Sequence, residues 1–355
     1  MKIDSLYMEI NNFCNNKCVY CYNTDRSNDY ISTDILKKII IGAKKVGVKC
    51  VVLSGGEPTL HPDFLQILDI IHDFNLKICL STNGTFFNKK MIEKFNDYKI
   101  SLQLSLDTLD PVSYKNIRNS NTYNKVFNNL NLLLEQKINF NVGIVLFDES
   151  VRTLEFTVEK LCEMGIKTIH VDDVKSVGFA KNSKLLKLSN YYDTLVLLYQ
   201  LQKKFYPKIS IDFIENILLR TCSKTCPLSF CNCMGGNMIQ ADVKGNVYQC
   251  KNIPSTFIGN FFETDFFNLI NNACKNIVTY KNINDCKNCK YGYICLGGCR
   301  SKPKQVYLKS DRCKDIYKFI DLVFKEKNAG KIDDLLFEIQ LSNEYNRMNG
   351  YFKYI

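Results

Sequence analysis

The chain has 355 residues, 46% of them hydrophobic, so it can bury the core of one large domain and a smaller one. Its formal net charge of +11 does not indicate a nucleic-acid partner, because the lysines are scattered among asparagines and form no basic stripe interleaved with aromatic residues. No apolar run approaches the roughly 18 residues of a membrane span, and the first residues show no signal-peptide pattern, so we expect a cytoplasmic protein with no membrane partner.

Residues 5 to about 171 alternate strand-like and helix-like stretches. The predicted strands are 6–10, 50–53, 77–81, 100–106, 139–146 and 168–171. Helical patterns lie between them, with Ser32 or Thr33 as one cap, Asp110-Pro111 as another, and a further helix over 151–164. Six such units predict an α/β fold with a parallel sheet and right-handed crossovers, a partial (β/α)6 TIM-like barrel. Functional side chains then belong at the carboxyl ends of the strands.

Three cysteines follow the first predicted strand. Cys14, Cys18 and Cys21 have the spacing C-x3-C-x2-C in the string CNNKCVYCY. Three thiolates on one loop would hold a [4Fe–4S] cluster by three of its four irons and leave the fourth open to a small ligand. The alternative is a structural zinc site, which needs a fourth ligand nearby, and the next cysteine is Cys50 inside an apolar run.

A second motif, SGGEP at residues 54–58, directly follows the second predicted strand. Two glycines let the backbone approach a ligand closely, and Glu57 adds a carboxylate that can receive an ammonium group. Together the two motifs resemble the radical S-adenosylmethionine (SAM) superfamily. The resemblance implies that the three cysteines bind the cluster and that SAM chelates its open iron. It also implies that Gly55, Gly56 and Glu57 contact SAM.

The same resemblance implies further SAM contacts. Asn83 follows the third predicted strand, where the superfamily often places polar contacts. Ser105 lies in LSLDTLDP with Asp107, which resembles the family's SLD segment, where a serine often meets the SAM carboxylate. Arg118 on the next helix is a candidate for that carboxylate. Tyr20 would be the aromatic residue beside the adenine.

The stretch from 172 to 220 carries fewer signals. It contains a predicted helix over 191–205 and a short strand over 209–213. His170 lies at a predicted strand end that faces the barrel mouth, so it is a candidate site residue. His61, at the start of a helix, is expected to be structural.

A second cysteine pattern begins after residue 221. Cys233 and Cys250 bracket Gly245 in C-x11-G-x4-C, and a C-x2-C-x5-C-x3-C run and a last cysteine follow. The later cysteines are Cys286, Cys289, Cys295, Cys299 and Cys313. All seven positions resemble the SPASM tail of radical SAM enzymes. Paired zinc ribbons are the alternative, but their C-x2-C knuckles come in matched pairs, and only one C-x2-C is present after residue 221.

The SPASM resemblance implies two auxiliary [4Fe–4S] clusters, and so three clusters in all. The ligands of the second auxiliary cluster would be Cys286, Cys289, Cys295 and Cys313. The ligands of the first would be Cys233, Cys250, Cys299 and one of Cys222, Cys226 and Cys231. Cys226 is favoured because six residues let the chain loop round a cluster. A hairpin over 237–248, turning at 244–246, would carry ligands of the first. The remaining cysteines, Cys50, Cys79, Cys162 and Cys274, are expected to be small core residues.

Three regions are therefore expected. Residues 1–220 form the barrel and a connecting segment, and residues 221–320 form the cysteine-rich SPASM domain. Residues 321–355 form a helical cap, in which amphipathic helices pack on the barrel. Because the first strand is expected by about residue 6, we expect no N-terminal leader-binding domain of the kind that some peptide-modifying relatives carry.

The resemblance implies reductive cleavage of SAM to a 5′-deoxyadenosyl radical that abstracts a hydrogen atom. The leading expectation is a peptide or protein substrate that is cross-linked or oxidised, with flavodoxin or ferredoxin as the electron donor in an anaerobic setting. The alternatives are oxidation or epimerisation of a sugar or aminocyclitol, and anaerobic sulfatase maturation. A non-catalytic metal-binding scaffold is the last alternative, and it would have no need of GGEP.

Lys251 follows the second cysteine of the hairpin, where sulfatase-maturing relatives commonly carry an aspartate that acts as a base. An ammonium group cannot take a proton unless burial lowers its pKa by several units. It suits a substrate carboxylate or a negatively charged cluster better. Because Lys251 stands where the aspartate is expected, sulfatase maturation is ranked below peptide cross-linking. The sequence does not name the substrate, the carbon attacked, the bond formed or the oligomeric state.

Overall fold

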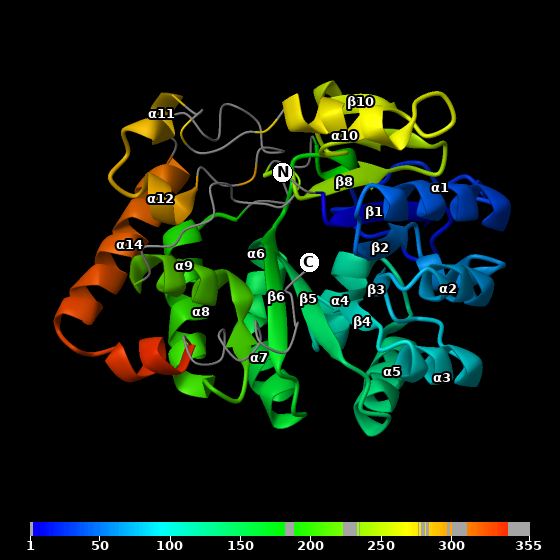
Figure 1. The fold of residues 1–355 in the computed structure, drawn as a ribbon. Coiled ribbons are helices and arrows are strands. Elements are labelled where there is room, and N and C mark those ends of the chain that lie inside the picture. The colour runs from blue at the N-terminus through cyan, green and yellow to red at the C-terminus, as the bar shows by residue number, and fades with distance from the viewer. Residues whose placement is uncertain are drawn as a thin grey trace.

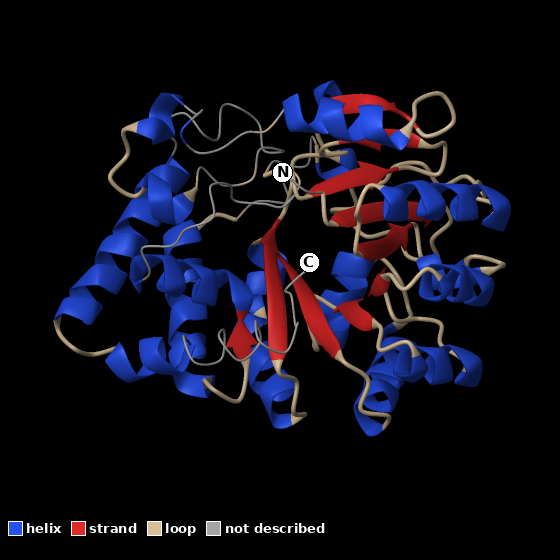
Figure 2. Cartoon of the chain, in the orientation of Figure 1, coloured by secondary structure: helices blue, strands red, loops and turns tan. Residues whose placement is uncertain are grey.

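The computed structural model describes residues 3–181, 188–222, 233, 235–275, 277, 281, 284–296, 299 and 311–339. Six parallel strands form its centre, in chain order, and helices lie outside them (Figures 1 and 2). The strands are β1 (Ser5–Asn11), β2 (Cys50–Gly55), β3 (Lys77–Thr82), β4 (Ser101–Ser105), β5 (Phe140–Leu146) and β6 (Thr168–Asp173). Each predicted strand is confirmed, with its ends within two residues of the prediction. The described sheet is open, with β7 and β10 at its edges, so the partial barrel is also confirmed.

Helices lie between these strands, and three of them begin at a short polar side chain that accepts a backbone N–H. The helices are α1 (Thr33–Lys45), α2 (Phe64–Asp73), α3 (Lys89–Asp97), α4 (Pro111–Arg118), α5 (Tyr123–Glu135), α6 (Asp148–Arg152) and α7 (Leu154–Glu163). Ser32 accepts a hydrogen bond from the Ile35 N–H at 3.4 Å, and Asp110 accepts one from the Ser113 N–H at 2.7 Å. Both predicted caps are thus confirmed, each contributing about 1 kcal/mol to helix stability.

One predicted helix, over 151–164, is divided in two. α6 ends and α7 begins at Thr153, whose φ of −110° and ψ of 9° are not helical. The Thr153 hydroxyl lies 2.8 Å from the Thr108 hydroxyl, and the Ser150 hydroxyl donates to the Val145 carbonyl oxygen at 2.7 Å. These tertiary bonds hold the first turn onto the end of β5, which the apolar periodicity could not indicate.

After β6 the chain forms α8 (Tyr191–Phe205), β7 (Ser210–Ile211) and α9 (Asp212–Cys222). The helix agrees with its prediction, whereas the strand is shorter than the predicted 209–213. β7 pairs with β6 through two residues only, because Asp212 already begins α9. The Ile211 N–H donates to Gln202 Oε1 at 2.6 Å, which fixes α8 against this short strand.

The predicted hairpin is confirmed and joins the central sheet. β8 (Met238–Ala241) and β9 (Asn246–Tyr248) are antiparallel, and β10 (Phe257–Asn260) adds a third strand. β8 pairs with β1 in parallel, so the turn after β8 lies at the same edge as the carboxyl ends of β1 to β6. Neither the third strand nor the pairing with β1 was predicted. Asp242 caps the turn by accepting from the Lys244 and Asn246 N–H groups at 2.9 and 3.0 Å.

Helices complete the described part of the chain. They are α10 (Phe266–Lys275), α11 (Asn284–Lys287), α12 (Gly292–Cys295), α14 (Asp311–Asn328) and a short helix at 333–339. α14 is amphipathic, and its apolar face is buried at Phe319, Ile320 and Val323. α14 packs on α8 and α9 at the side of the barrel far from α1 and α2 (Figure 1). No helix among the described residues is long and apolar enough to cross a membrane.

Side chains alternate between the helix-covered face of the sheet and the barrel lumen. On β1, Leu6, Met8 and Ile10 belong to the main core, whereas Tyr7 packs in a separate cluster with Cys50 and Val52. This second cluster also contains Cys79, Cys233, Met238 and Cys250. Cys50, Cys79 and Met238 come from the first half of their strands, so the cluster fills the amino-terminal part of the lumen.

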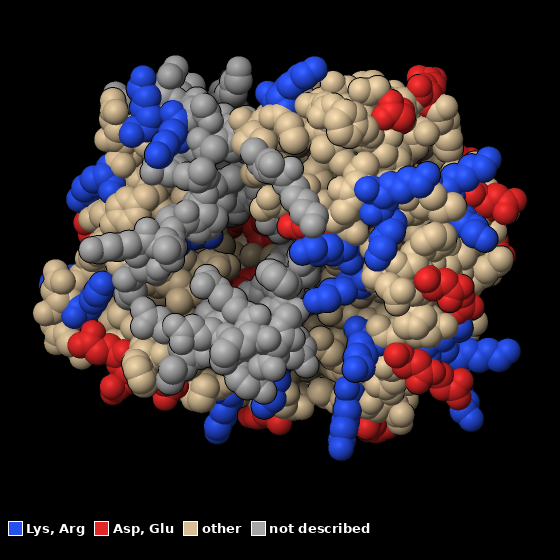
Figure 3. Space-filling view, in the orientation of Figure 1, with Lys and Arg blue, Asp and Glu red and all other residues tan. Residues whose placement is uncertain are grey.

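The carboxyl-terminal part of the lumen is polar. The alternation places the following side chains there: Glu9, Ser54, Ser81, Gln103, Asn141 and His170. Figure 3 shows one face of the molecule, with basic and acidic side chains interspersed over its surface and a hollow at its centre. A polar lumen that opens at the carboxyl ends of the strands is where a barrel of this kind binds its ligands.

Candidate active site at the carboxyl ends of the strands

The loop that carries Cys14, Cys18 and Cys21 follows β1 and packs on the end of β2. The Gly56 N–H donates to the Asn11 carbonyl oxygen at 2.7 Å, and the Glu57 N–H donates to the Phe13 carbonyl oxygen at 2.8 Å. A Cβ atom on Gly55 would lie 2.3 Å from the Asn11 oxygen, and one on Gly56 would lie 2.0 Å from the Phe13 oxygen. Both glycines are therefore required for the cysteine loop to approach the strand end.

Cys14 lies within reach of the end of β3. Its sulfur accepts from the Asn16 N–H at 3.5 Å and from Asn83 Nδ2 at 3.8 Å. The Asn83 amide is oriented by the Thr85 N–H, which donates to its Oδ1 at 2.9 Å. Burial raises the pKa of the Cys14 thiol to about 11. A thiolate at this position therefore requires a positive partner, which a bound iron supplies.

Cys18 is paired with Arg118. The Arg118 Nη1 donates to the Cys18 sulfur at 3.7 Å, and its Nη2 lies 2.8 Å from Asp107 Oδ2. Tyr20 donates to the same Asp107 oxygen at 2.6 Å, and the Val145 N–H donates to the other at 2.9 Å. Arg118 and Asp107 are both buried. This group anchors the cysteine loop to α4 and β5, and of the Arg118 nitrogens only Nε has no hydrogen-bond partner in the described structure.

Glu57 is buried, and its carboxylate joins the ends of β2 and β3. Its Oε1 accepts from the Thr59 hydroxyl at 2.7 Å, the Thr59 N–H at 3.1 Å and the Thr82 hydroxyl at 2.6 Å. Its Oε2 accepts from the Asn83 N–H at 2.7 Å. Burial raises the pKa of Glu57 above the ordinary value, because its effect is larger than the opposite effect of these hydrogen-bond donors. The carboxylate therefore holds the Asn83 backbone in place, and Oε2 keeps one acceptor site for a further donor.

The side chains around the loop fit an iron–sulfur cluster. Two of the three thiols accept N–H donors, which is the arrangement that stabilises negative charge on a metal-bound sulfur. Across the described ranges, no three His, Cys, Asp or Glu side chains converge on the position of a single metal ion. A cluster binds each thiolate through a different iron, so its ligands need no common point.

Residues 8–161 match the family model of the Radical SAM superfamily. This stretch is a radical SAM domain. The superfamily is one of enzymes that use SAM with a [4Fe–4S] cluster, and the matched residues include the cysteine loop, GGEP, Asn83 and Ser105.

Two curated relatives show how the likeness is distributed. The chain is 32% identical over 165 residues to a "Probable GTP 3′,8-cyclase" of Methanococcus maripaludis, a match covering 45% of this chain and 53% of the relative. The chain thus spans about half the length of that cyclase. It is 23% identical over 315 residues to an "AdoMet-dependent heme synthase" of Methanosarcina barkeri, a match covering 81% of this chain and 88% of that relative.

Two solved structures share the fold. Native anSMEcpe with bound AdoMet has a TM-score of 0.76 at 21% identity and covers 93% of this chain and 99% of its own. Streptococcus suis SuiB bound to S-adenosylmethionine has a TM-score of 0.64 at 20% identity and covers 88% of this chain and 76% of its own. Both likenesses extend past the radical SAM domain into the cysteine-rich half of the chain.

In the radical SAM domain, the sequence-predicted residues come together. Hydrogen bonds join Asn83 to Cys14 and Arg118 to Cys18. Ser105 ends β4, in register with Gly143 of β5. Tyr20 lies edge-on to Phe147, with ring centroids 6.0 Å apart.

The two histidines of interest differ. His61 Nδ1 accepts from the Asp63 N–H at 3.0 Å and Nε2 lies 2.9 Å from the Ile31 carbonyl oxygen, so its structural role is confirmed. His170 Nδ1 lies 2.5 Å from Asp212 Oδ2 at the start of α9. Burial lowers the pKa of His170, but the Asp212 carboxylate more than offsets this and raises it above the ordinary value. His170 therefore carries a partner in the lumen wall, and its site role stays a prediction.

The auxiliary-cluster cysteines are described in part. Cys233 and Cys250 are buried together, Cys286, Cys289, Cys295 and Cys299 are half-buried, and Cys313 is exposed in the first turn of α14. Cys226 and Cys231 lie outside the described residues, as does the side chain of Cys222, so the fourth ligand stays open. Cys50 and Cys79 are buried as predicted, with sulfurs 3.5 Å apart, whereas Cys162 and Cys274 are half-buried.

Sequence reasoning missed a polar network beside the hairpin. Glu9, wholly buried on β1, forms an ion pair with Lys251. The Gln240 amide donates from Nε2 to the Cys233 sulfur at 3.2 Å and accepts the Lys251 N–H at Oε1 at 2.7 Å. The signal for Glu9 was a carboxylate in the otherwise apolar strand LYMEI, at a lumen-facing position. The signal for Gln240 did not exist in the sequence, because it depends on β8 pairing with β1.

Proposed function

We propose that this protein is a radical SAM enzyme that cleaves SAM reductively and abstracts a hydrogen atom from a side chain of a peptide or protein. The observation that carries the proposal is the cysteine loop after β1, with N–H donors aimed at the sulfurs of Cys14 and Cys18. The bound [4Fe–4S] cluster and SAM supply a 5′-deoxyadenosyl radical there.

The chain's own residues hold and orient these groups. Cys14, Cys18 and Cys21 are the cluster ligands, and Asn83 and Arg118 stabilise the negative charge on two of the sulfurs. We assign the SAM site to the side chains and backbone around this loop. These residues are Tyr20, Gly55, Gly56, Glu57, Asn83 and Ser105, with Arg118 behind them. Because Arg118 already binds Asp107, we assign it to the support of the loop and give the SAM carboxylate to Ser105.

We assign the region 221–320 to a SPASM domain with two auxiliary [4Fe–4S] clusters, after a barrel region of 1–220 and before a helical cap of 321–355. Cys233 precedes β8 and Cys250 follows β9, and both are buried in the same cluster of side chains, which supports their assignment to one iron–sulfur cluster. Gln240 donates to the Cys233 sulfur, so it would stabilise the thiolate of that cluster. The fourth ligand is one of Cys222, Cys226 and Cys231.

A peptide substrate is supported by two similar structures that were solved with peptides bound. One is anSMEcpe with AdoMet and the Cp18Cys peptide, and another is SuiB with its precursor peptide SuiA. The curated relatives are named for a nucleotide cyclase and a heme synthase, so modification of a small molecule is the second candidate. The proposal also includes a cytoplasmic location and an electron donor such as flavodoxin or ferredoxin, which would reduce the cluster.

Metal content tests the cluster assignment. Protein reconstituted anaerobically with iron and sulfide should hold roughly 12 iron and 12 sulfide per chain, because three ligand groups imply three [4Fe–4S] clusters. The same sample, with dithionite and SAM, should form 5′-deoxyadenosine. An iron count near 4 with normal SAM cleavage would remove the auxiliary clusters and keep the radical SAM proposal. Stoichiometric zinc without SAM cleavage would contradict both.

A peptide assay tests the ranking of sulfatase maturation. The reduced enzyme and SAM are incubated with a peptide carrying Cys-x-Pro-x-Arg, and mass spectrometry measures formylglycine. We expect less than about 1% conversion, because the Lys251 ammonium is ion-paired to Glu9 and does not accept a proton. SAM cleavage measured in the same tube separates an inactive enzyme from a wrong substrate. Efficient formation of formylglycine would reverse the ranking.

A further inference from the structure

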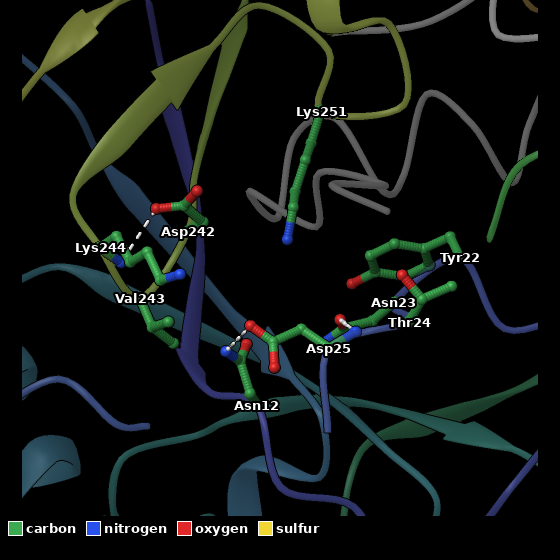
Figure 4. A pocket seen from close by; sticks show the side chains of 9 residues that line it. All are labelled: Asn12, Tyr22, Asn23, Thr24, Asp25, Asp242, Val243, Lys244 and Lys251. Atoms are coloured by element: carbon green, nitrogen blue, oxygen red, sulfur yellow. Dashed lines mark hydrogen bonds between the residues drawn. The ribbon is translucent and has the colours of Figure 1, made fainter. Parts of the chain in front are cut away.

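A pocket lies between the cysteine loop and the hairpin, at the carboxyl end of β1 (Figure 4). Its volume is about 240 Å³. One wall is formed by the segment that directly follows Cys21, and the other by the turn after β8 and by Lys251. The lining residues are Asn12, Tyr22, Asn23, Thr24, Asp25, Asp242, Val243, Lys244 and Lys251.

Both carboxylates of this pocket are engaged by their own turns. Asp25 accepts from Asn12 Nδ2 and from the Ser27 N–H, each at 2.9 Å. Asp242 accepts from the Lys244 N–H at 2.9 Å and from Asn246 Nδ2 at 3.1 Å. Their oxygens are therefore directed at neighbouring donors of the chain, and the groups left to meet a ligand are mainly donors.

Asn23 is the first of these donors. Its Oδ1 accepts from the Asp25 N–H at 3.0 Å, and because an N–H can only donate, this bond fixes which end of the amide is oxygen. Asn23 is only 5% exposed. Its Nδ2, on the other side of the amide, is buried and has no hydrogen-bond partner among the described residues. A buried amide donor without a partner costs about 1–3 kcal/mol, a cost that a ligand oxygen would remove.

Lys251 is the second donor. Figure 4 shows its side chain extending from the hairpin toward the side of the pocket that holds Asn12 and Asp25. Its ammonium is paired with Glu9, but an ammonium has three N–H donors, and the side chain keeps 25% of its surface exposed. Glu9 lies behind it, fully buried, with Oε1 unpartnered in the described structure. The pair therefore fixes a cation at the floor of the pocket.

The surrounding charge limits which anion this site can take. Asp25 and Asp242 place two negative charges at the pocket and Lys244 places one positive charge there, while the ion pair of Lys251 with Glu9 is neutral as a unit, so the lining carries one net negative charge. A doubly charged phosphate would meet more repulsion than a singly charged carboxylate. The volume of about 240 Å³ also suits one small acidic group and not a nucleoside triphosphate.

We propose that this pocket binds a carboxylate group of the substrate, with Lys251 Nζ and Asn23 Nδ2 as its two donors. The inference rests on the proposed function, in that the pocket adjoins the cysteine loop and so places this carboxylate beside the site of radical formation. An acidic side chain, a peptide C-terminus and a small carboxylic acid share this chemistry.

Binding measurements test the site without any turnover. The full-length, anaerobically reconstituted protein is titrated with four probes by calorimetry or ligand-observed NMR. N-acetyl-glutamyl amide presents a side-chain carboxylate, N-acetylglycine a terminal one, N-acetyl-glutaminyl amide its neutral counterpart, and inorganic phosphate a doubly charged anion. We expect one of the carboxylate probes to bind at least about tenfold more tightly than the neutral probe and phosphate, as a charge-assisted pair of hydrogen bonds implies. The tighter of the two distinguishes a side chain from a C-terminus.

Two variants and a matched control assign the effect to residues. Lys251→Met with Glu9→Gln removes the ion pair without leaving a buried charge, and Asn23→Asp keeps the acceptor for the Asp25 N–H while removing the donor. Each should weaken carboxylate binding about tenfold. Lys203→Met with Glu326→Gln makes the same change in an ion pair between α8 and α14 and should leave binding unchanged. If the double variant does not fold, Asn23→Asp decides alone.

The proposal would be overturned if neither carboxylate probe bound more tightly than the glutaminyl probe, if phosphate bound more tightly than both carboxylate probes, or if binding were unchanged in the variants that fold. Because no electron donor or SAM is needed, these outcomes are independent of whether the protein cleaves SAM. Absence of 5′-deoxyadenosine would contradict the proposed function while leaving a measured carboxylate site intact.

Discussion

Replacing Cys14, Cys18 and Cys21 together with alanine is expected to reduce 5′-deoxyadenosine formation to the level of a no-enzyme control. These three thiols lie on the loop that packs against the GGEP end of β2, and the hydrogen bonds to Cys14 and Cys18 place them beside Asn83 and Arg118. Without them no cluster can hold SAM at this site, whereas the proposed auxiliary clusters keep their ligands. Roughly two-thirds of the iron should therefore remain.

The measurement is product formation by chromatography, with iron counted on the same sample. Replacing Cys162 and Cys274, which lie outside both cysteine motifs, with alanine is the matched control and should leave iron and activity unchanged. If the triple variant still cleaves SAM with dithionite, the catalytic loop has been misidentified. If it loses all its iron, the auxiliary clusters do not form independently of the loop.

Replacing Asp107 with asparagine is expected to lower the free energy of unfolding by about 3–5 kcal/mol. Asp107 is fully buried and its Oδ2 lies 2.8 Å from Arg118 Nη2, so the variant leaves a buried guanidinium without its counter-charge. Asparagine keeps an oxygen for the Val145 N–H and tolerates the φ of 68° at this position, so the loss reports the charge and not the backbone.

Anaerobic urea unfolding of the reconstituted protein measures this effect. Asp110→Asn is the matched control, because asparagine caps a helix about as well as aspartate, and it should change stability by less than about 0.5 kcal/mol. The double variant Asp107→Asn with Arg118→Met should recover part of the loss by removing the uncompensated charge. A loss below about 1 kcal/mol for Asp107→Asn would show that solvent reaches Arg118 and that the pair is not an anchor of the cysteine loop.

Local patterns in the sequence were enough to predict the barrel. Strands such as 50–53 and 77–81 are short apolar runs between capped amphipathic helices, and their order alone implies parallel pairing. The cysteine loop, GGEP and Asn83 each follow a predicted strand, so their convergence at one edge of the sheet was also predictable. These features could be predicted from sequence spacing, because residues on one loop are neighbours in the sequence as well as in space.

Only the tertiary structure decided what the charged residues do. Arg118 was predicted near the SAM carboxylate, but the structure pairs it with Asp107 and Cys18, and Glu57 is satisfied by Thr59, Thr82 and Asn83. Lys251 was recognised as a cation beside a proposed cluster ligand, yet its partner Glu9 lies 242 residues away. The Lys251–Glu9 pair forms because β8 aligns beside β1. A buried charged side chain pairs with the opposite charge that the fold brings next to it. The separation of the two residues in the sequence does not reveal which residue that is.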